Sequence, residues 1–120
     1  MRILIVDDSK AMRMIVTRTM RQAGFADHDF VEATNGVEGL ESVAEAQPDL
    51  ILCDWNMPEM SGIDFLRTLR AQGNDVKFGF VTSESTPAMR NLADENGALF
   101  LIAKPFTADT FKQSLSGVLV

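Results

Sequence analysis

Residues Leu50-Ile51-Leu52-Cys53-Asp54 place a carboxylate directly after four consecutive apolar residues. A short, continuously apolar run is typical of a parallel strand that helices cover on both faces, whereas a strand with one wet face would alternate. Three further strong runs recur at intervals of about one strand and one helix, at residues 3–6, 78–81 and 99–102, and a weaker run lies at residues 30–33. We therefore predict a five-stranded parallel α/β sheet.

Helical patterns separate these runs. Apolar residues of one helix face recur within residues 12–20, and Arg13 lies on the opposite, polar face. Ser9 is suited to cap the start of that helix and Gly24 its end. Further helices are expected at residues 37–46, 62–71, 87–95 and 108–119. Each helix follows a strand, so the predicted order is (βα)5 over a single domain, residues 1–120, and right-handed crossovers leave few topologies.

The composition excludes several classes of protein. A chain of 120 residues with a formal net charge of −6 suits one acidic domain and argues against binding nucleic acid, which needs an excess of Lys and Arg. The lone cysteine, Cys53, excludes an intramolecular disulfide, and no basic leader segment follows Met1, so the cytoplasm is the expected location. No apolar stretch approaches the roughly 20 residues that cross a bilayer. We expect a monomer that is not inserted in a membrane.

Polar side chains follow the strands at the point where each run ends. Asp7 and Asp8 follow the first strong run, Asp54 the second, Thr82 the third, and Lys104 lies just beyond the fourth. In an open α/β sheet, ligands bind beyond the carboxyl ends of the strands. These side chains are therefore expected to share one rim of the sheet.

Three carboxylates on one rim would repel one another. Two unit charges about 4 Å apart cost about 4 kcal/mol at an effective dielectric of 20, so either a carboxyl group keeps its proton or a cation binds. The oxygen-only ligand set, without a neighbouring His or Cys, favours Mg²⁺ over zinc. Alternatively, Asp7 and Asp8 decorate a helix N-terminus, Asp54 caps a loop and Lys104 is a surface amine. The joint occurrence at four strand ends favours a site.

The motifs at these strand ends resemble the receiver domain of two-component response regulators. They are Ile-Val-Asp-Asp-Ser at residues 5–9, Asp-Trp-Asn-Met-Pro at residues 54–58 followed by Gly62, Val-Thr-Ser at residues 81–83 and Lys-Pro-Phe at residues 104–106. The resemblance covers essentially the whole chain. Because nothing follows the last predicted helix, the chain is most similar to the single-domain, chemotaxis-type (CheY-like) subgroup. The resemblance implies a flavodoxin-like fold with strand order 2-1-3-4-5.

The resemblance also implies roles for the rim residues. Asp54 would be the phosphoacceptor, attacking phosphohistidine on a kinase. Asp7, Asp8, Asp54 and the backbone carbonyl of Asn56 would bind Mg²⁺. Lys104 and Thr82 would contact the phosphoryl oxygens.

Further positions would modulate the site. Pro105 resembles the family's proline, whose preceding peptide bond is typically cis. Asn56 and Glu84 would flank the incoming water and set the lifetime of the phosphoryl group, which we expect to be short. Leu101 stands where many receivers carry Tyr or Phe. In those receivers the position of the aromatic side chain responds to the threonine, so the resemblance leaves in question whether Leu101 responds to Thr82 in the same way. We interpret Leu101 as a partner-facing apolar contact.

The implied function is signalling. A histidine kinase would be the phosphodonor, a phosphatase is a further candidate partner, and a downstream protein would bind the face formed by the fourth helix, fifth strand and fifth helix, in chemotaxis or motility control. The chain would catalyse only its own phosphotransfer and autodephosphorylation. A haloacid-dehalogenase-type phosphatase would need an acid where Asn56 stands. A phosphate sink, an adaptor and a fragment of a larger regulator remain alternatives, and Trp55 is a candidate partner-facing residue beside the site.

Overall fold

The protein is described here by a computed structural model that covers residues 1–118. Five parallel strands form one sheet in the order 2-1-3-4-5, as the family resemblance predicted. The strands are β1 (Arg2–Val6), β2 (Asp29–Ala33), β3 (Leu50–Cys53), β4 (Lys77–Thr82) and β5 (Phe100–Ala103).

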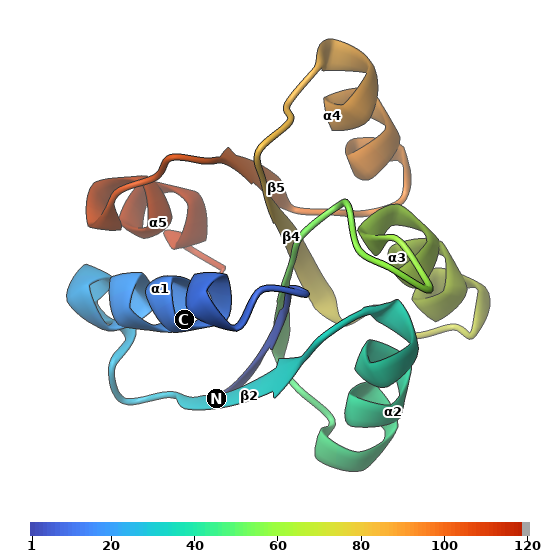
Figure 1. The fold of residues 1–120 in the computed structure, drawn as a ribbon, viewed down its shortest axis with the longest axis horizontal. Coiled ribbons are helices and arrows are strands. Elements are labelled where there is room, and N and C mark those ends of the chain that lie inside the picture. The colour runs from blue at the N-terminus through green and yellow to red at the C-terminus, as the bar shows by residue number, and fades with distance from the viewer. Residues whose placement is uncertain (119–120) are drawn as a thin grey trace.

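Five α-helices cover the sheet in two layers. On one face lie α1 (Lys10–Met20) and α5 (Ala108–Leu115), and on the other lie α2 (Gly36–Ala46), α3 (Gly62–Ala71) and α4 (Pro87–Glu95) (Figure 1). Alternate residues of each strand enter opposite layers of the core: Leu4 and Val6 of β1 pack towards α2 and α3, whereas Ile3 and Ile5 pack towards α1 and α5. Burial on both faces explains why the strand sequences are continuously apolar.

Some element ends differ from the sequence-based expectation. Strand β5 begins at Phe100, one residue later than predicted, and Leu99 before it is 53% exposed. Helix α1 ends at Met20 and continues as a wider π-type turn, Arg21–Phe25, in which Gly24 has a φ of 102°. Helix α5 ends at Leu115 because the next residue leaves helical geometry, with a ψ of 120°. Residue 119, the predicted end of that helix, lies outside the described residues.

A glycine in β4 allows an aromatic ring to lie directly on the strand. Gly79 pairs with Phe100 of β5, and a Cβ atom added to Gly79 would lie 2.1 Å from the Phe100 ring. Any other residue at position 79 would have to displace that ring, so the glycine provides space for close packing.

Helix α4 is attached mainly at its C-terminal end. Ala93, near that end, is its one fully buried residue. Arg70 of α3 donates hydrogen bonds to the carbonyl oxygens of Asn96 (3.2 Å) and Gly97 (3.1 Å), which follow α4. The same guanidinium group also reaches the carbonyl oxygens of Asn74 (2.9 Å) and Val76 (3.0 Å), ahead of β4. Arg70 therefore fastens the end of α4 to the body of the domain.

Among residues 1–118, no helix combines the length and apolar character required to cross a membrane.

Candidate functional site

The acidic side chains meet at the carboxyl ends of the two central strands. The backbone N–H of Asp7 donates to the carbonyl oxygen of Ala33 (3.1 Å), and the N–H of Asp54 donates to that of Val6 (2.9 Å). These bonds extend the sheet pairing by one residue, so that both side chains emerge from the same rim. Carboxylate oxygens of Asp7, Asp8 and Asp54 all lie within 4.8 Å of one another. The structure thus brings together the three acids singled out by the sequence.

Asp7 is the most deeply buried of the three acids. Its Oδ1 accepts a hydrogen bond from the backbone N–H of Ser9 (2.9 Å), and the side chain of Ser9 in turn caps α1. Burial raises the pKa of the Asp7 carboxyl group, and the nearby Asp54 charge adds to that effect, whereas the Ser9 amide and the Lys104 ammonium oppose it. Ionised Asp7 is therefore costly unless a positive charge accompanies it.

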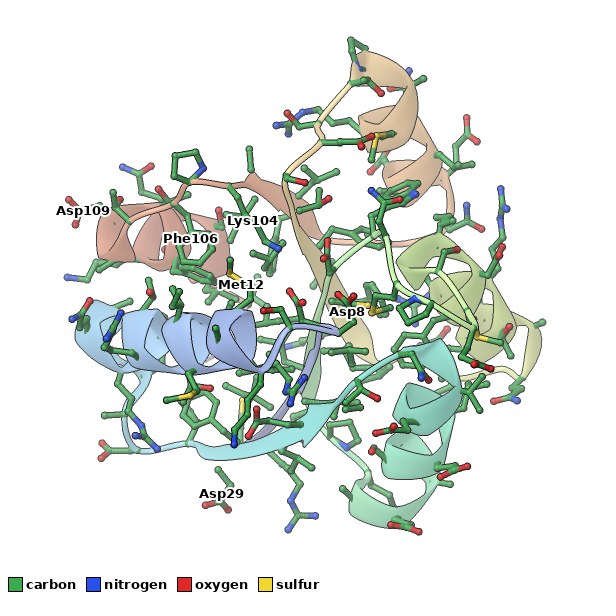
Figure 2. All side chains as sticks on the ribbon, in the orientation of Figure 1. Asp8, Met12, Asp29, Lys104, Phe106 and Asp109 are labelled. Carbon is green, nitrogen blue, oxygen red and sulfur yellow. The ribbon has the colours of Figure 1, made fainter. Side chains whose placement is uncertain are left out.

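Lys104 supplies that positive charge from the loop after β5. Its backbone N–H donates to the carbonyl oxygen of Thr82 (2.8 Å), and the peptide bond to Pro105 is cis, as the family resemblance implied. The Lys104 Nζ atom lies 3.3 Å from Asp7 Oδ2 and 3.5 Å from Asp54 Oδ2. In Figure 2 this side chain points from the loop towards the end of β1, where Asp8 is labelled. One largely buried ammonium group thus links two of the three carboxylates.

A tight loop holds Asp54 in place. Its Oδ1 accepts a hydrogen bond from the backbone N–H of Trp55 (2.7 Å), and the N–H of Gly62, the first residue of α3, donates to the Trp55 carbonyl oxygen (2.8 Å). A Cβ atom added to Gly62 would lie 2.1 Å from the Asp54 carbonyl oxygen. Only glycine permits α3 to begin this close to the acid.

Trp55 itself does not face solvent. The residue is 9% exposed, and its ring lies 4.7 Å from that of Phe80, centroid to centroid. The interpretation of Trp55 as a partner-facing residue was therefore wrong: the side chain turns inward, because the apolar layer under α3 and α4 offers its indole more contact than the rim does.

The loops after β3 and β4 approach each other beside the acids. The exposed Asn56 side chain donates from Nδ2 to Glu84 Oε1 at 3.5 Å, a long hydrogen bond. Thr82 is fully buried, and its hydroxyl oxygen accepts a hydrogen bond from the Glu84 N–H (3.4 Å). Glu84 thus touches both Asn56 and Thr82, the two positions that flank the acidic cluster on this side.

Leu101 lies away from the acidic cluster, on β5. It is half-buried and packs against the core layer that contains the α4 side chains, whereas Phe100 packs on the opposite face of the sheet. With Arg90 of α4 and the exposed Leu99, it lines a hollow between α4 and β5 of about 170 Å³.

One contact of the acidic segment was not foreseen from the sequence. Arg13 of α1 donates from Nη1 to the carbonyl oxygen of Asp7 (2.7 Å) and from Nε to Glu32 Oε1 (2.8 Å), and its side chain is only 12% exposed. The helical pattern assigned Arg13 to the solvent side of α1. The available signal was Glu32, an acid that interrupts the apolar run of β2.

The chemistry of the cluster suits a hard divalent cation. All its ligand atoms are carboxylate oxygens, and a single ammonium leaves the cluster with an excess of negative charge when all three acids are ionised. Such a donor set matches the preference of Mg²⁺ for a few carboxylates completed by water or phosphoryl oxygens.

Comparisons with known proteins agree with this geometry. The sequence profile of the response regulator receiver domain matches residues 3–116. The chemotaxis protein CheY1 of Helicobacter pylori is 37% identical over 122 residues, which cover 99% of this chain and 97% of the relative. The chemotaxis protein CheY-3 of Vibrio cholerae is 37% identical over 120 residues, covering 98% and 91%. The solved structure of Vibrio cholerae chemotaxis protein CheY4 superposes with a TM-score of 0.86 at 31% identity and covers 98% of each chain. The chain therefore belongs to the response regulator receiver domains, which are signalling switches and not conventional enzymes.

Proposed function

We propose that Asp54 accepts a phosphoryl group from phosphohistidine of a partner histidine kinase, and that phosphorylation changes how this chain binds a downstream protein. The observation that carries the proposal is the convergence of the Asp7, Asp8 and Asp54 carboxylates within 4.8 Å, with the Lys104 ammonium bridging two of them. A nucleophile, a set of cation ligands and a fixed positive charge are the parts that phosphoryl transfer to a carboxylate needs.

In the transfer step, an Asp54 carboxylate oxygen attacks phosphorus as the P–N bond to the kinase imidazole breaks. The imidazole leaves with the bonding electron pair and takes up a proton, and an acyl phosphate remains on Asp54. The Trp55 N–H holds Oδ1 at 2.7 Å and so fixes the plane of the carboxylate before the donor arrives. A carboxylate held in one orientation reacts without first losing rotational freedom.

Asp7, Asp8 and Asp54 would hold Mg²⁺ together with the Asn56 carbonyl oxygen, which accepts no backbone hydrogen bond within residues 1–118. When bound, the ion supplies charge neutralisation for the phosphoryl oxygens. Lys104 would contact the same oxygens from the other side. Its ammonium already lies 3.5 Å from Asp54, so a small rotation of the side chain is enough.

The switch would begin at Thr82. The phosphoryl group brings up to about two negative charges and three strong acceptors, and the Thr82 hydroxyl would donate to one of them. That contact would draw in residues 83–86 and with them Thr86, whose side chain caps the start of α4. The face of α4, β5 and α5 would then change. Moving an equilibrium from 1:99 to 99:1 takes about 5.5 kcal/mol. We expect the phosphoryl contacts to supply only part of this free energy and binding of the partner to supply the rest.

Chemotaxis relatives at 37% identity support a role in motility control. As further parts of the proposal, residues 1–120 act as one monomeric, cytoplasmic domain, and a phosphatase is a second partner. A phosphate sink or adaptor is the second candidate function, and Leu101 favours it. Leu101 is half-buried and lacks the aromatic ring by which many receivers respond to the state of the threonine at the position of Thr82. Binding of the phosphorylated chain to a motor or other output protein would distinguish the two.

Asn56 and Glu84 support a short phosphoryl lifetime. Both are polar, and their contact at 3.5 Å bridges the two loops beside Asp54, where an attacking water must enter. Chasing the phosphorylated chain in Mg²⁺ at neutral pH and following its intact mass measures the lifetime. Persistence for many hours would contradict this part of the proposal.

The central test uses Mg²⁺ with acetyl phosphate or, as a stable surrogate, beryllofluoride. The Trp55 backbone is bonded to Asp54, so we expect quenching of its fluorescence in the parent protein and none in Asp54→Asn. A parent-like response in Asp54→Asn would show that another group is the phosphoacceptor.

A further inference from the structure

The segment that carries the two neighbouring acids, residues 7–9, is held by a strand, by a helix and by a hydrogen bond of its own. The Asp7 N–H donates a hydrogen bond to the Ala33 carbonyl oxygen of β2, and the Ser9 N–H donates one to the Asp7 carboxylate. Asp8, between them, is exposed, and the hydrogen bonds of the segment end on its two neighbours. Asp8 is therefore oriented through its two flanking peptide units: the Asp7 carboxylate holds the unit that joins it to Ser9, and a side chain of α1 holds the unit that joins it to Asp7.

Arg13 holds that peptide unit. Its Nη1 atom lies 2.7 Å from the Asp7 carbonyl oxygen, a short distance typical of a hydrogen bond from a charged donor. Because the peptide group is planar, holding the Asp7 carbonyl oxygen also restrains the position of the Asp8 N–H and Cα, and so the point from which the Asp8 carboxylate projects. The backbone N–H of Arg13 donates to the Ser9 carbonyl oxygen (3.0 Å), so one residue closes the segment at both ends.

Glu32 in turn orients Arg13. The guanidinium donates from Nε to Glu32 Oε1 at 2.8 Å while Nη1 holds Asp7, so that two edges of one rigid planar group are occupied. The Glu32 side chain is 49% exposed, and an ion pair with so exposed a partner stabilises the fold only slightly. Its more specific effect is on the direction of the guanidinium group.

From these contacts we infer that Arg13 is a positioning residue of the cation site: it aims the Asp8 carboxylate through the Asp7–Asp8 peptide group, and Glu32 keeps it in the orientation needed to do so. The inference rests on the proposed Mg²⁺ site and adds residues that touch neither the ion nor the phosphoryl group.

The sign of the effect separates positioning from simple electrostatics. A guanidinium beside a cation site repels the cation, so loss of its charge alone would tighten Mg²⁺ binding. Loss of positioning would weaken it. The informative comparisons are therefore between proteins of equal charge that differ in the contact.

Two charge-matched comparisons test the inference by calorimetric titration with Mg²⁺ alone. Arg13→Lys keeps the charge but cannot hold both partners, and we expect its dissociation constant to rise about three- to tenfold over the parent. Glu32→Ala and Glu32→Gln remove the same charge, but only Gln keeps an acceptor for Nε. We expect Glu32→Ala to bind Mg²⁺ two- to threefold more weakly than Glu32→Gln. A cooperative urea-unfolding transition, measured without Mg²⁺, shows that each variant is folded.

Equal affinity of Arg13→Lys and the parent, or of the two Glu32 variants, would overturn the inference. If Arg13→Lys does not fold, the Glu32 pair decides. Asp8→Asn serves as the reference for a lost ligand. If the parent shows no saturable Mg²⁺ binding, the proposed cation site itself fails; if the parent binds and only Asp8→Asn is impaired, the site stands and Arg13 has no positioning role.

Discussion

Replacing Gly62 by alanine should separate the placement of Asp54 from the stability of the fold. The added Cβ would lie 2.1 Å from the Asp54 carbonyl oxygen and 3.0 Å from the Phe80 ring. Since the carbonyl belongs to the backbone, it must retreat by about 1 Å, and a misplacement of about 1 Å at a reacting group can cost on the order of 100-fold in rate. We expect a phosphorylation rate 10- to 100-fold below the parent's.

The loss of stability should be much smaller. Overpacking typically costs about 1–3 kcal/mol, and replacing Gly by Ala inside an element returns about 0.5–1 kcal/mol of backbone entropy. The net destabilisation of Gly62→Ala is then about 0–2.5 kcal/mol, which leaves most of the protein folded at a typical domain stability of about 5–15 kcal/mol. Urea unfolding measures this quantity.

Gly79→Ala is the matched control. Its Cβ would also meet an atom at 2.1 Å, but that atom belongs to the Phe100 ring, on the face of the sheet covered by α1 and α5. A comparable loss of stability is expected, with the parent's phosphorylation rate. The rate is followed by intact mass with Mg²⁺ and acetyl phosphate, so that no fluorescence change at Trp55 is needed. A parent-like rate in Gly62→Ala, or equal slowing in both variants, would refute the reasoning.

Three further predictions concern charged residues. In EDTA at pH 7, Asp7→Asn should raise the free energy of unfolding. Burial raises the folded pKa of Asp7, so the parent loses stability as pH rises through that pKa. The stability advantage of the variant should therefore vanish at pH values below 3.8, the ordinary pKa of an aspartate. Urea titrations across pH check this, and a less stable variant at pH 7 would contradict it. Lys104→Met leaves two carboxylates without their ammonium partner, so Mg²⁺ should raise its Tm by more than it raises the parent's, and a smaller shift would count against the assigned contacts. Arg70→Met removes the donor from four carbonyl oxygens and should lower the unfolding free energy by about 2–4 kcal/mol. Arg70→Lys should restore less than half of that loss, because an ammonium lacks the planar fork, and full recovery would show that charge alone matters.

The strands show what a sequence pattern can and cannot predict. Strand β3 has the bounds that the apolar run predicted, because both of its faces are buried. The predicted start of β5 was one residue early, because Leu99 is apolar yet exposed. Hydrophobicity reports how well a side chain would tolerate burial, not whether the fold buries it. The strand order came from the family resemblance, since no short-range pattern states which strands are neighbours.

The site shows the same division. Asp7, Asp8 and Asp54 could be placed on one rim because each follows a strand, and parallel strands end together. The inward turn of Trp55 and the inward reach of Arg13 could not, since both depend on partners far away in the sequence, Phe80 and Glu32. Periodicity assigns a side chain to a face of its own helix or loop. It says nothing about what the neighbouring element offers.

The one-sided attachment of α4 has an evolutionary consequence. The first half of this helix contributes no fully buried residue, while Ala93 and the contacts of Arg70 hold its far end. Substitutions on the outer surface of that half should therefore cost little stability, since surface changes away from packed contacts usually fall within about 0.5 kcal/mol. The fold and the acidic cluster can stay constant while this surface drifts. Under the proposal that the face of α4, β5 and α5 binds the downstream protein, a lineage acquires a new output protein through a few neutral steps, without rebuilding the chemistry that triggers it.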